Sequence, residues 1–170
     1  MSISELTRVH SIGYMTEDVK VRFKKDVKLN ILSVSVDAKE NDTQTVPRWL
    51  ADLFQENKLA EIQGRDMSND LASALSKERI AGSEQISSLK PDFYIRLNDF
   101  IKNEKATGRD KLNILMQDLV RMRLGKIVHF ARSAPLTPEL EQKLTYEEKV
   151  FFHMIHKASQ DFKQCVLGGK

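Results

Sequence analysis

The sequence has little of what disulfide, membrane or nucleotide chemistry needs. It contains one cysteine, Cys165, and only seven glycines among 170 residues. A single cysteine cannot form an internal disulfide, and no apolar run approaches the roughly 20 residues that span a bilayer. The N-terminus also lacks the apolar run of a secretory signal. We therefore expect an intracellular protein with few phosphate-binding loops.

Motifs for catalysis, cofactors and metals are also missing. The sequence has no GxGxxG, no GxxxxGK[ST] and no HExxH pattern. His153 and His156 are spaced to share a helix face, but a metal site needs further ligands, and none has suitable spacing. A nucleophilic cysteine needs a base and a cationic pocket, and the sequence indicates neither for Cys165, which lies near the C-terminus. We expect no catalytic residue, no cofactor and no metal, and thus a protein that is not an enzyme.

What the sequence does contain is typical of a folded, helix-rich domain. Hydrophobic residues make up 41% and charged residues 30% of the chain, which is enough for a core and a well-solvated surface. The formal charge is only +3. A dedicated nucleic-acid-binding protein is usually more basic, so docking to other proteins is the better expectation.

Residues 1–37 are predicted to form strands. Val19, Val21 and Phe23 are separated by basic residues, so apolar and basic side chains lie on opposite faces of a half-buried strand. A second apolar series changes phase at residues 31–32, and a strand changes face only through an extra residue or a turn. A bulge or tight turn is therefore predicted there.

The pattern then changes from strand to helix. Residues 37–45 are polar and are predicted to be a surface loop. In residues 46–54 the apolar positions share one helical face, and Pro47 suits a first turn. The polar residues 63–70 form the predicted linker. Residues 1–63 are thus expected to be a small β-rich module that ends with one helix.

From residue 64 to the C-terminus the apolar spacing is helical. Caps and prolines predict four helices. They cover about residues 68–83, 91–107 and 109–132, and a last stretch from 137 or 145 to 166. Short connections between such helices predict a bundle. The expected fold class is α+β and mostly α, with a β-rich module over 1–63 and a helical bundle over 64–170.

Three short motifs stand in these modules. Glu78-Arg79 is followed by a Pro-Asp-Phe-Tyr run at residues 91–94, and the basic segment 121–127 ends in Lys-Ile. In the first module, residues 46–51 read Val-Pro-Arg-Trp-Leu-Ala. Together these motifs resemble signatures of the helical domain and the small β domain of the GINS family of replication proteins.

The order of the modules, β first, resembles one class of GINS subunit: the archaeal subunit related to eukaryotic Psf-type subunits with an N-terminal β domain. The resemblance implies a non-catalytic partner of the helical-domain-first subunit in a two-plus-two heterotetramer. It also implies association with the MCM helicase and a RecJ-like DHH-family protein at the replication fork. The implied role is to scaffold and activate the helicase, in the cytoplasm at the nucleoid.

Basic residues near the end of the third predicted bundle helix are candidates for facing a partner or DNA. They are Arg121, Arg123, Lys126 and Arg132, and no acidic residue lies among them. Three interpretations stay open: a solvated face, a positive surface toward an acidic partner subunit, and weak contact with phosphates. The alternative function is a DNA-binding regulator, which would need a concentrated basic recognition helix.

Aromatic residues are candidates for core or interface positions. Their helical spacing favours packing over an exposed platform for stacking bases. A tryptophan near a domain surface can also anchor an interface. The candidates are Trp49, Phe93, Tyr94, Phe100 and Phe151.

Overall fold

The chain folds into a small β-rich unit and a helical unit. The computed structural model describes residues 3–31, 34–64 and 66–168. One compact unit covers Val9–Arg65 and the other covers Asp66–Lys170 together with Met1–Arg8. The expected class, α+β and mostly α with a small β-rich module before the helical region, is confirmed. Independent folding of the two parts, which the sequence-based division at residues 63 and 64 anticipates, stays a prediction.

The N-terminal segment is a helix, which corrects the strand prediction for residues 1–37. Helix α1 spans Ile3–Met15, and Thr16 Oγ1 closes its end by donating to the carbonyl of Gly13 over 2.8 Å. The alternation that indicated strands begins only at Val19. Extending that pattern back to the N-terminus was therefore wrong.

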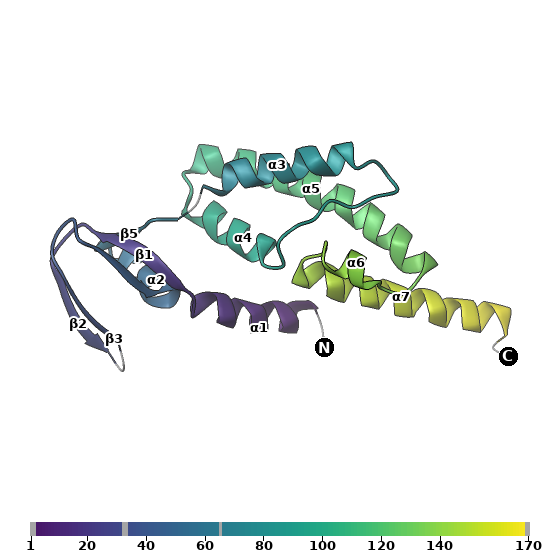
Figure 1. Cartoon of the computed structure of the whole chain (residues 1–170), viewed down its shortest axis with the longest axis horizontal. Coiled ribbons are helices and arrows are strands. Elements are labelled where there is room, and N and C mark those ends of the chain that lie inside the picture. The colour runs from purple at the N-terminus through teal and green to yellow at the C-terminus, as the bar shows by residue number, and fades with distance from the viewer. Residues whose placement is uncertain (1–2, 32–33, 65, 169–170) are drawn as a thin grey trace. The chain divides into compact units, whose positions relative to one another are not determined.

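Strand β1 (Asp18–Phe23) is the centre of a three-stranded antiparallel sheet with the order β4-β1-β5. Figure 1 shows β1 and β5 beside each other. The sequence missed β4 (Thr43–Pro47), most of which falls in the predicted loop, and β5 (Ala60–Ile62). Thr43 is exposed and only Val46 of β4 is buried. A strand so polar resembles a loop in sequence.

Strands β2 (Val27–Ile31) and β3 (Val34–Ala38) form a separate antiparallel hairpin. Ile31 pairs with Val34, so the chain reverses where the apolar pattern changes phase. The predicted turn itself falls on residues 32–33, which lie outside the described residues.

Helix α2 (Arg48–Glu56) completes the β-rich unit. Leu50 and Phe54 of this helix pack on Val21 and Phe23 of β1, and all four side chains are at most 2% exposed. The rings of Phe23 and Phe54 meet edge to face, with centroids 5.4 Å apart. This unit therefore has its own hydrophobic core.

In the helical unit, side-chain caps define three helix starts. Asp66 Oδ1 accepts from the Ser68 amide over 2.8 Å, so the first helix begins slightly before the predicted cap. Thr137 and Thr145 each cap a helix, so the two alternative starts of the last helix are both used. The helices are α3 (Met67–Ile80), α4 (Phe93–Asn103), α5 (Ala106–Ser133), α6 (Pro138–Glu141) and α7 (Tyr146–Leu167).

Two apolar clusters hold these helices together. The first joins α3, α4 and the N-terminal half of α5, with Leu71, Leu97 and Leu119 fully buried. The second joins the C-terminal half of α5 to α7 through Ile127 and Phe152. The stretch of α5 between the two clusters carries the charged residues described next.

Candidate interaction surfaces of the helical unit

Arg123 lies between the two apolar clusters and is 1% exposed. Its Nε and Nη2 donate to the two carboxylate oxygens of Glu148 over 2.6 and 2.8 Å. Its Nη1 donates to Glu78 Oε2 and to the Ser87 carbonyl, each over 2.7 Å, and Nη2 also reaches the Lys143 carbonyl over 3.1 Å. A guanidinium has five N–H donors, so Arg123 is fully satisfied.

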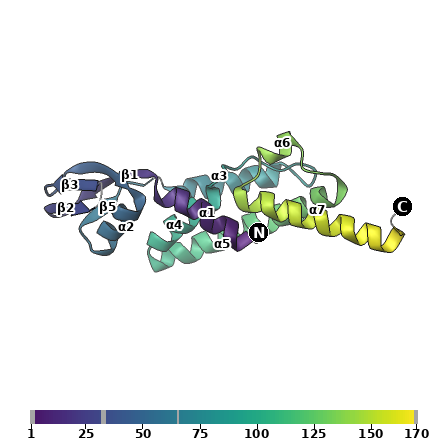
Figure 2. The ribbon, with the colours of Figure 1, turned by 90° about the horizontal axis from the view of Figure 1, so that it is seen from below.

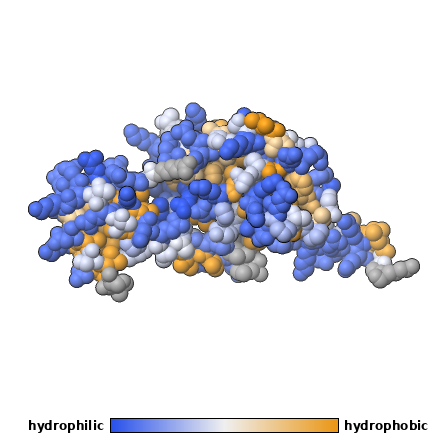
Figure 3. All heavy atoms as spheres, in the orientation of Figure 1, coloured by the Kyte–Doolittle hydropathy of each residue, from blue (hydrophilic) through white to orange (hydrophobic). Residues whose placement is uncertain are grey.

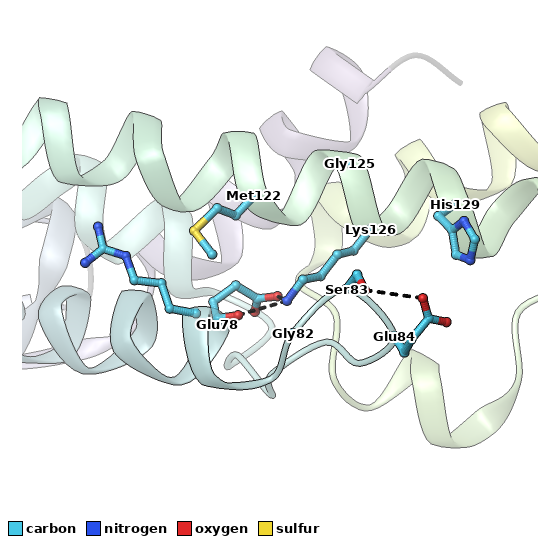
Figure 4. A pocket seen from close by; sticks show the side chains of 9 residues that line it. Glu78, Gly82, Ser83, Glu84, Met122, Gly125, Lys126 and His129 are labelled. Atoms are coloured by element: carbon cyan, nitrogen blue, oxygen red, sulfur yellow. Dashed lines mark hydrogen bonds and ion pairs between the residues drawn. The ribbon is translucent and has the colours of Figure 1, made fainter.

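Lys126, one turn further along α5, adds a second buried cation. Its Nζ donates to the carbonyl of Glu78 over 2.9 Å and to the Glu78 carboxylate (Figure 4). Tyr94 of α4 donates its hydroxyl to Glu148 Oε1 over 2.9 Å. Two buried cations thus face two buried carboxylates. We call these five residues, Glu78, Tyr94, Arg123, Lys126 and Glu148, the Arg123 network.

The network changes the acidity of its members. Burial alone would raise the pKa of Glu78, but hydrogen bonds from Lys126 and Ser87 and the charge of Arg123 outweigh it, so the pKa lies below its ordinary value. Burial and the neighbouring Glu148 carboxylate raise the pKa of Tyr94. Tyr94 therefore stays a neutral donor and Glu78 stays ionised at neutral pH.

The basic residues predicted to face a partner or DNA do not form one surface. Arg123 and Lys126 are buried in ion pairs with carboxylates of the same chain, so neither lies on an exposed basic surface. Arg121 and Arg132 are exposed, and Arg121 pairs with Asp118 one turn away. Without its two central cations α5 does not have the concentrated basic face that a recognition helix would need.

The partners of Arg123 could not be predicted from the sequence. Glu78 belongs to a motif there, and no pattern indicates Glu148 as a partner. Glu148 does have a local signal, because it forms a capping box with Thr145 at the start of α7. Its second role, as a partner of Arg123 25 residues away, depends on the tertiary fold.

A pocket of about 420 Å³ lies beside the network, between the C-terminal end of α3 and the middle of α5. Met122, Lys126 and His129 line it from α5, and Glu78 lines it from α3 (Figure 4). Gly125 also borders the pocket, and a Cβ added there would meet no atom within 4 Å. No steric contact within this chain therefore requires glycine at this position in the middle of the 28-residue helix α5.

Gly125→Ala should raise the free energy of unfolding by about 0.5–1 kcal/mol, because alanine loses less backbone entropy in a helix and fits without a clash. Urea denaturation measures this gain. Gly108→Ala is the comparison in the first turn of α5: its Cβ would come 2.8 Å from Glu104 Oε2, the end of a flexible side chain that must move aside, so its gain should be smaller. A destabilised Gly125→Ala chain would mean that the backbone at this position differs from the one described.

Helices α5 and α7 run in the same direction along their contact. Arg123 bonds Glu148 near the start of α7, and eight residues later the Ala131 carbonyl lies 2.8 Å from His156 Nδ1. Ile127 of α5 and Phe152 of α7 lie on this contact line. The direction matters because it determines which neighbouring residues share a side of the helix pair.

One side of the pair is apolar. On α5, Leu124 and Val128 each follow directly after a residue that contacts α7. On α7, Phe151 and Ile155 each come directly before a residue that contacts α5. Since parallel helices turn in the same sense, these four residues flank the contact on the same side. Val120 and Phe162 extend the two rows at helical spacing. We call Val120, Leu124, Val128, Phe151, Ile155 and Phe162 the α5–α7 face.

This face is poorly covered by the chain itself. Leu124 is 47% and Phe162 68% exposed, while Phe151 and Ile155 are half-buried. The last turns of α7 extend past the end of α5 and away from the other helices (Figures 1 and 2). Val166, also exposed, lies there, and a space-filling view shows a small apolar area at this end beside mostly polar surface (Figure 3). Exposed apolar side chains gathered on two adjacent helices are candidates for contact with another protein.

The aromatic candidates divide between core and partly exposed positions. Phe93 and Tyr94 are buried in the first cluster, and Phe100 packs against it half-buried. Trp49 packs half-buried against the core of the β-rich unit. Phe151 is half-buried beside the second cluster and belongs to the α5–α7 face.

Chemistry-bearing side chains elsewhere are scattered. Over residues 3–31, 34–64 and 66–168, no three of the His, Cys, Asp and Glu side chains are placed to hold a metal ion. His153 is exposed, and Cys165 is an exposed free thiol. Within the same described ranges, none of the helices has the length and apolar character to cross a membrane.

Comparison with known protein families gives a match over most of the chain. Residues 52–165 match the family described as the GINS complex protein helical bundle domain. A search of curated proteins found no match. The matched range covers more than half of the chain and includes both the Arg123 network and the α5–α7 face. The chain therefore belongs to the GINS family, whose members are subunits of a DNA-replication complex.

Proposed function

We propose that this chain is a non-catalytic subunit of an archaeal GINS complex. In this proposal it pairs with the helical-domain-first subunit in a two-plus-two heterotetramer. The tetramer braces and activates the MCM helicase at the replication fork, together with a RecJ-like DHH-family protein. Any contact of this chain with DNA is weak or indirect, because two of its four candidate basic residues are buried.

The observation that carries the proposal is the family match over the helical unit, combined with the position of the β-rich unit before it. The resemblance found from the sequence distinguishes two classes of GINS subunit by the order of their β domain and helical domain. The chain has the β-rich part first, which supports the class with an N-terminal β domain.

The α5–α7 face supports a protein partner. A side chain such as Phe162, which is 68% exposed, gains from burial roughly in proportion to the apolar area removed from water. Apolar residues on two adjacent helices suit a helical surface that packs across both. We therefore assign contact with the second GINS subunit to this face.

Coexpression with the helical-domain-first subunit should give a complex near twice the heterodimer mass by light scattering. Leu124→Asp combined with Phe162→Asp should weaken assembly by at least about tenfold, because a carboxylate would be buried in an apolar contact. The wild-type complex should also stimulate DNA unwinding by the MCM helicase, and the double variant should not.

Ile114→Asp is the matched control. Ile114 is an exposed apolar residue of α5, 61% accessible, that lies outside the α5–α7 face. Its substitution should leave assembly unchanged. Circular dichroism should show unaltered helicity in all variants, since each replaced side chain is substantially exposed. A wild-type chain that stays monomeric beside this partner would refute the proposed function.

A further inference from the structure

The Arg123 network joins α3, α4 and α7 to the middle of α5. Arg123 bonds Glu78 of α3, Glu148 of α7, and the carbonyls of Ser87 and Lys143 in the connections before α4 and α7. Tyr94 brings in α4 through Glu148. A single guanidinium thus bonds two other helices and two connections directly, and a third helix is linked to it through Glu148.

Stability does not explain such a network well. Burying ions removes them from water, and well-packed apolar residues at the same positions are often as stable or more so. Net charge is balanced here, with two cations facing two carboxylates, but the desolvation cost of all four remains. The arrangement therefore needs another explanation.

Hydrogen bonds in the network depend on direction, whereas apolar packing does not. The guanidinium fork is planar and rigid, and its bidentate contact with Glu148 joins a defined point of α5 to a defined point of α7. The apolar contact between these helices joins Ile127 and Ala131 of α5 to Phe152 of α7. Apolar cores of about the right size fold, but they specify a single arrangement less sharply.

We propose that the Arg123 network is a register lock, which fixes α7 against α5 in the one position that aligns the two rows of the α5–α7 face. The network works as a conformational device, and Arg123 acts as a positioning residue for the partner surface. The effect on partner binding rests on the proposed function. The effect on helix register does not.

The test replaces the whole network with apolar residues: Glu78→Leu, Tyr94→Phe, Arg123→Met, Lys126→Met and Glu148→Met in one chain. Tyr94→Phe removes a hydroxyl that would otherwise lose its acceptor. The melting midpoint of this variant should lie closer to wild type than that of Arg123→Met alone, which leaves two carboxylates unpaired. Its amide NMR spectrum should lose dispersion, and its affinity for the second GINS subunit should fall at least about tenfold.

The substitution Arg123→Lys distinguishes the effect of the bidentate guanidinium geometry from the effect of the positive charge. Lysine keeps the cation but cannot make the bidentate contact, so this variant should stay folded and still bind the partner more weakly than wild type. The control is Arg121→Lys, because Arg121 is exposed and pairs only within α5 in the described contacts.

Two results would overturn the lock. One is a fully apolar variant with wild-type NMR dispersion and wild-type partner affinity, since register would then be set by packing alone. The other is a fully apolar variant that melts as low as Arg123→Met or fails to fold, since the network would then supply stability. If the wild-type chain fails to bind the GINS partner, the proposed function is refuted, and the NMR comparison still decides the register lock.

Discussion

Replacing Arg123 with methionine lowers the free energy of unfolding by about 3–5 kcal/mol, because the substitution leaves Glu78 and Glu148 buried without their main cation. Methionine approximates the volume of the aliphatic stem, so little of this loss comes from a cavity. Urea denaturation of the full chain at neutral pH measures it. The carbonyls of Ser87 and Lys143 also lose a donor, which adds to the same loss.

Arg121→Met is the control for this measurement. Arg121 is two residues away on the same helix, and its side chain is 79% exposed beside Asp118. An exposed ion pair contributes roughly 0–1 kcal/mol, so the control should change stability little. If the two substitutions cost the same, the Arg123 contacts are not formed in solution.

Acidification should destabilise the chain through Glu78 in particular. The pKa of Glu78 in the folded chain lies below its ordinary value of 4.5, because bonds from Lys126 and Ser87 and the charge of Arg123 outweigh burial. A carboxyl with a depressed pKa stabilises the fold fully above its unfolded pKa, and this contribution is lost as pH falls through the folded pKa. The loss should therefore begin below about pH 4.5 and grow as the pH falls.

Glu78→Gln isolates this contribution. Glutamine does not titrate, so the stability difference between wild type and Glu78→Gln should be largest near pH 7 and should shrink in acid. Leu119→Ala is the comparison, because it removes buried apolar volume and should cost about 2–5 kcal/mol at every pH. A difference for Glu78→Gln that stays constant from pH 7 down to acid would contradict the assigned role of Glu78.

Local patterns determined much of the fold before any tertiary information. The helical periodicity after residue 64, the caps at Thr137 and Thr145 and the alternation around Val21 each depend on residues close in sequence. Local patterns also carried the resemblance to the GINS family. Such features are readable because the physical cause and the residue that shows it lie within a few positions.

The patterns failed where a neighbour in sequence was a poor guide to the neighbour in space. Strand β4 is polar on its exposed side, so only its pairing with β1 distinguishes it from a loop. Helix α1 was not predicted, because the strand alternation that starts at Val19 was extended back to the N-terminus. The apolar face shared by α5 and α7 likewise required knowing that these two helices run in the same direction.

The basic residues of α5 show what only the tertiary structure decided. From the sequence, Arg121, Arg123, Lys126 and Arg132 were equivalent cations on one helix. The fold separates them, because Arg123 faces Glu78 and Glu148, which are 45 and 25 residues away, while Arg121 faces solvent. A charged side chain can be buried where the fold places an oppositely charged side chain beside it. Helical periodicity determines which residues share a face, and the packing of distant segments determines what that face meets.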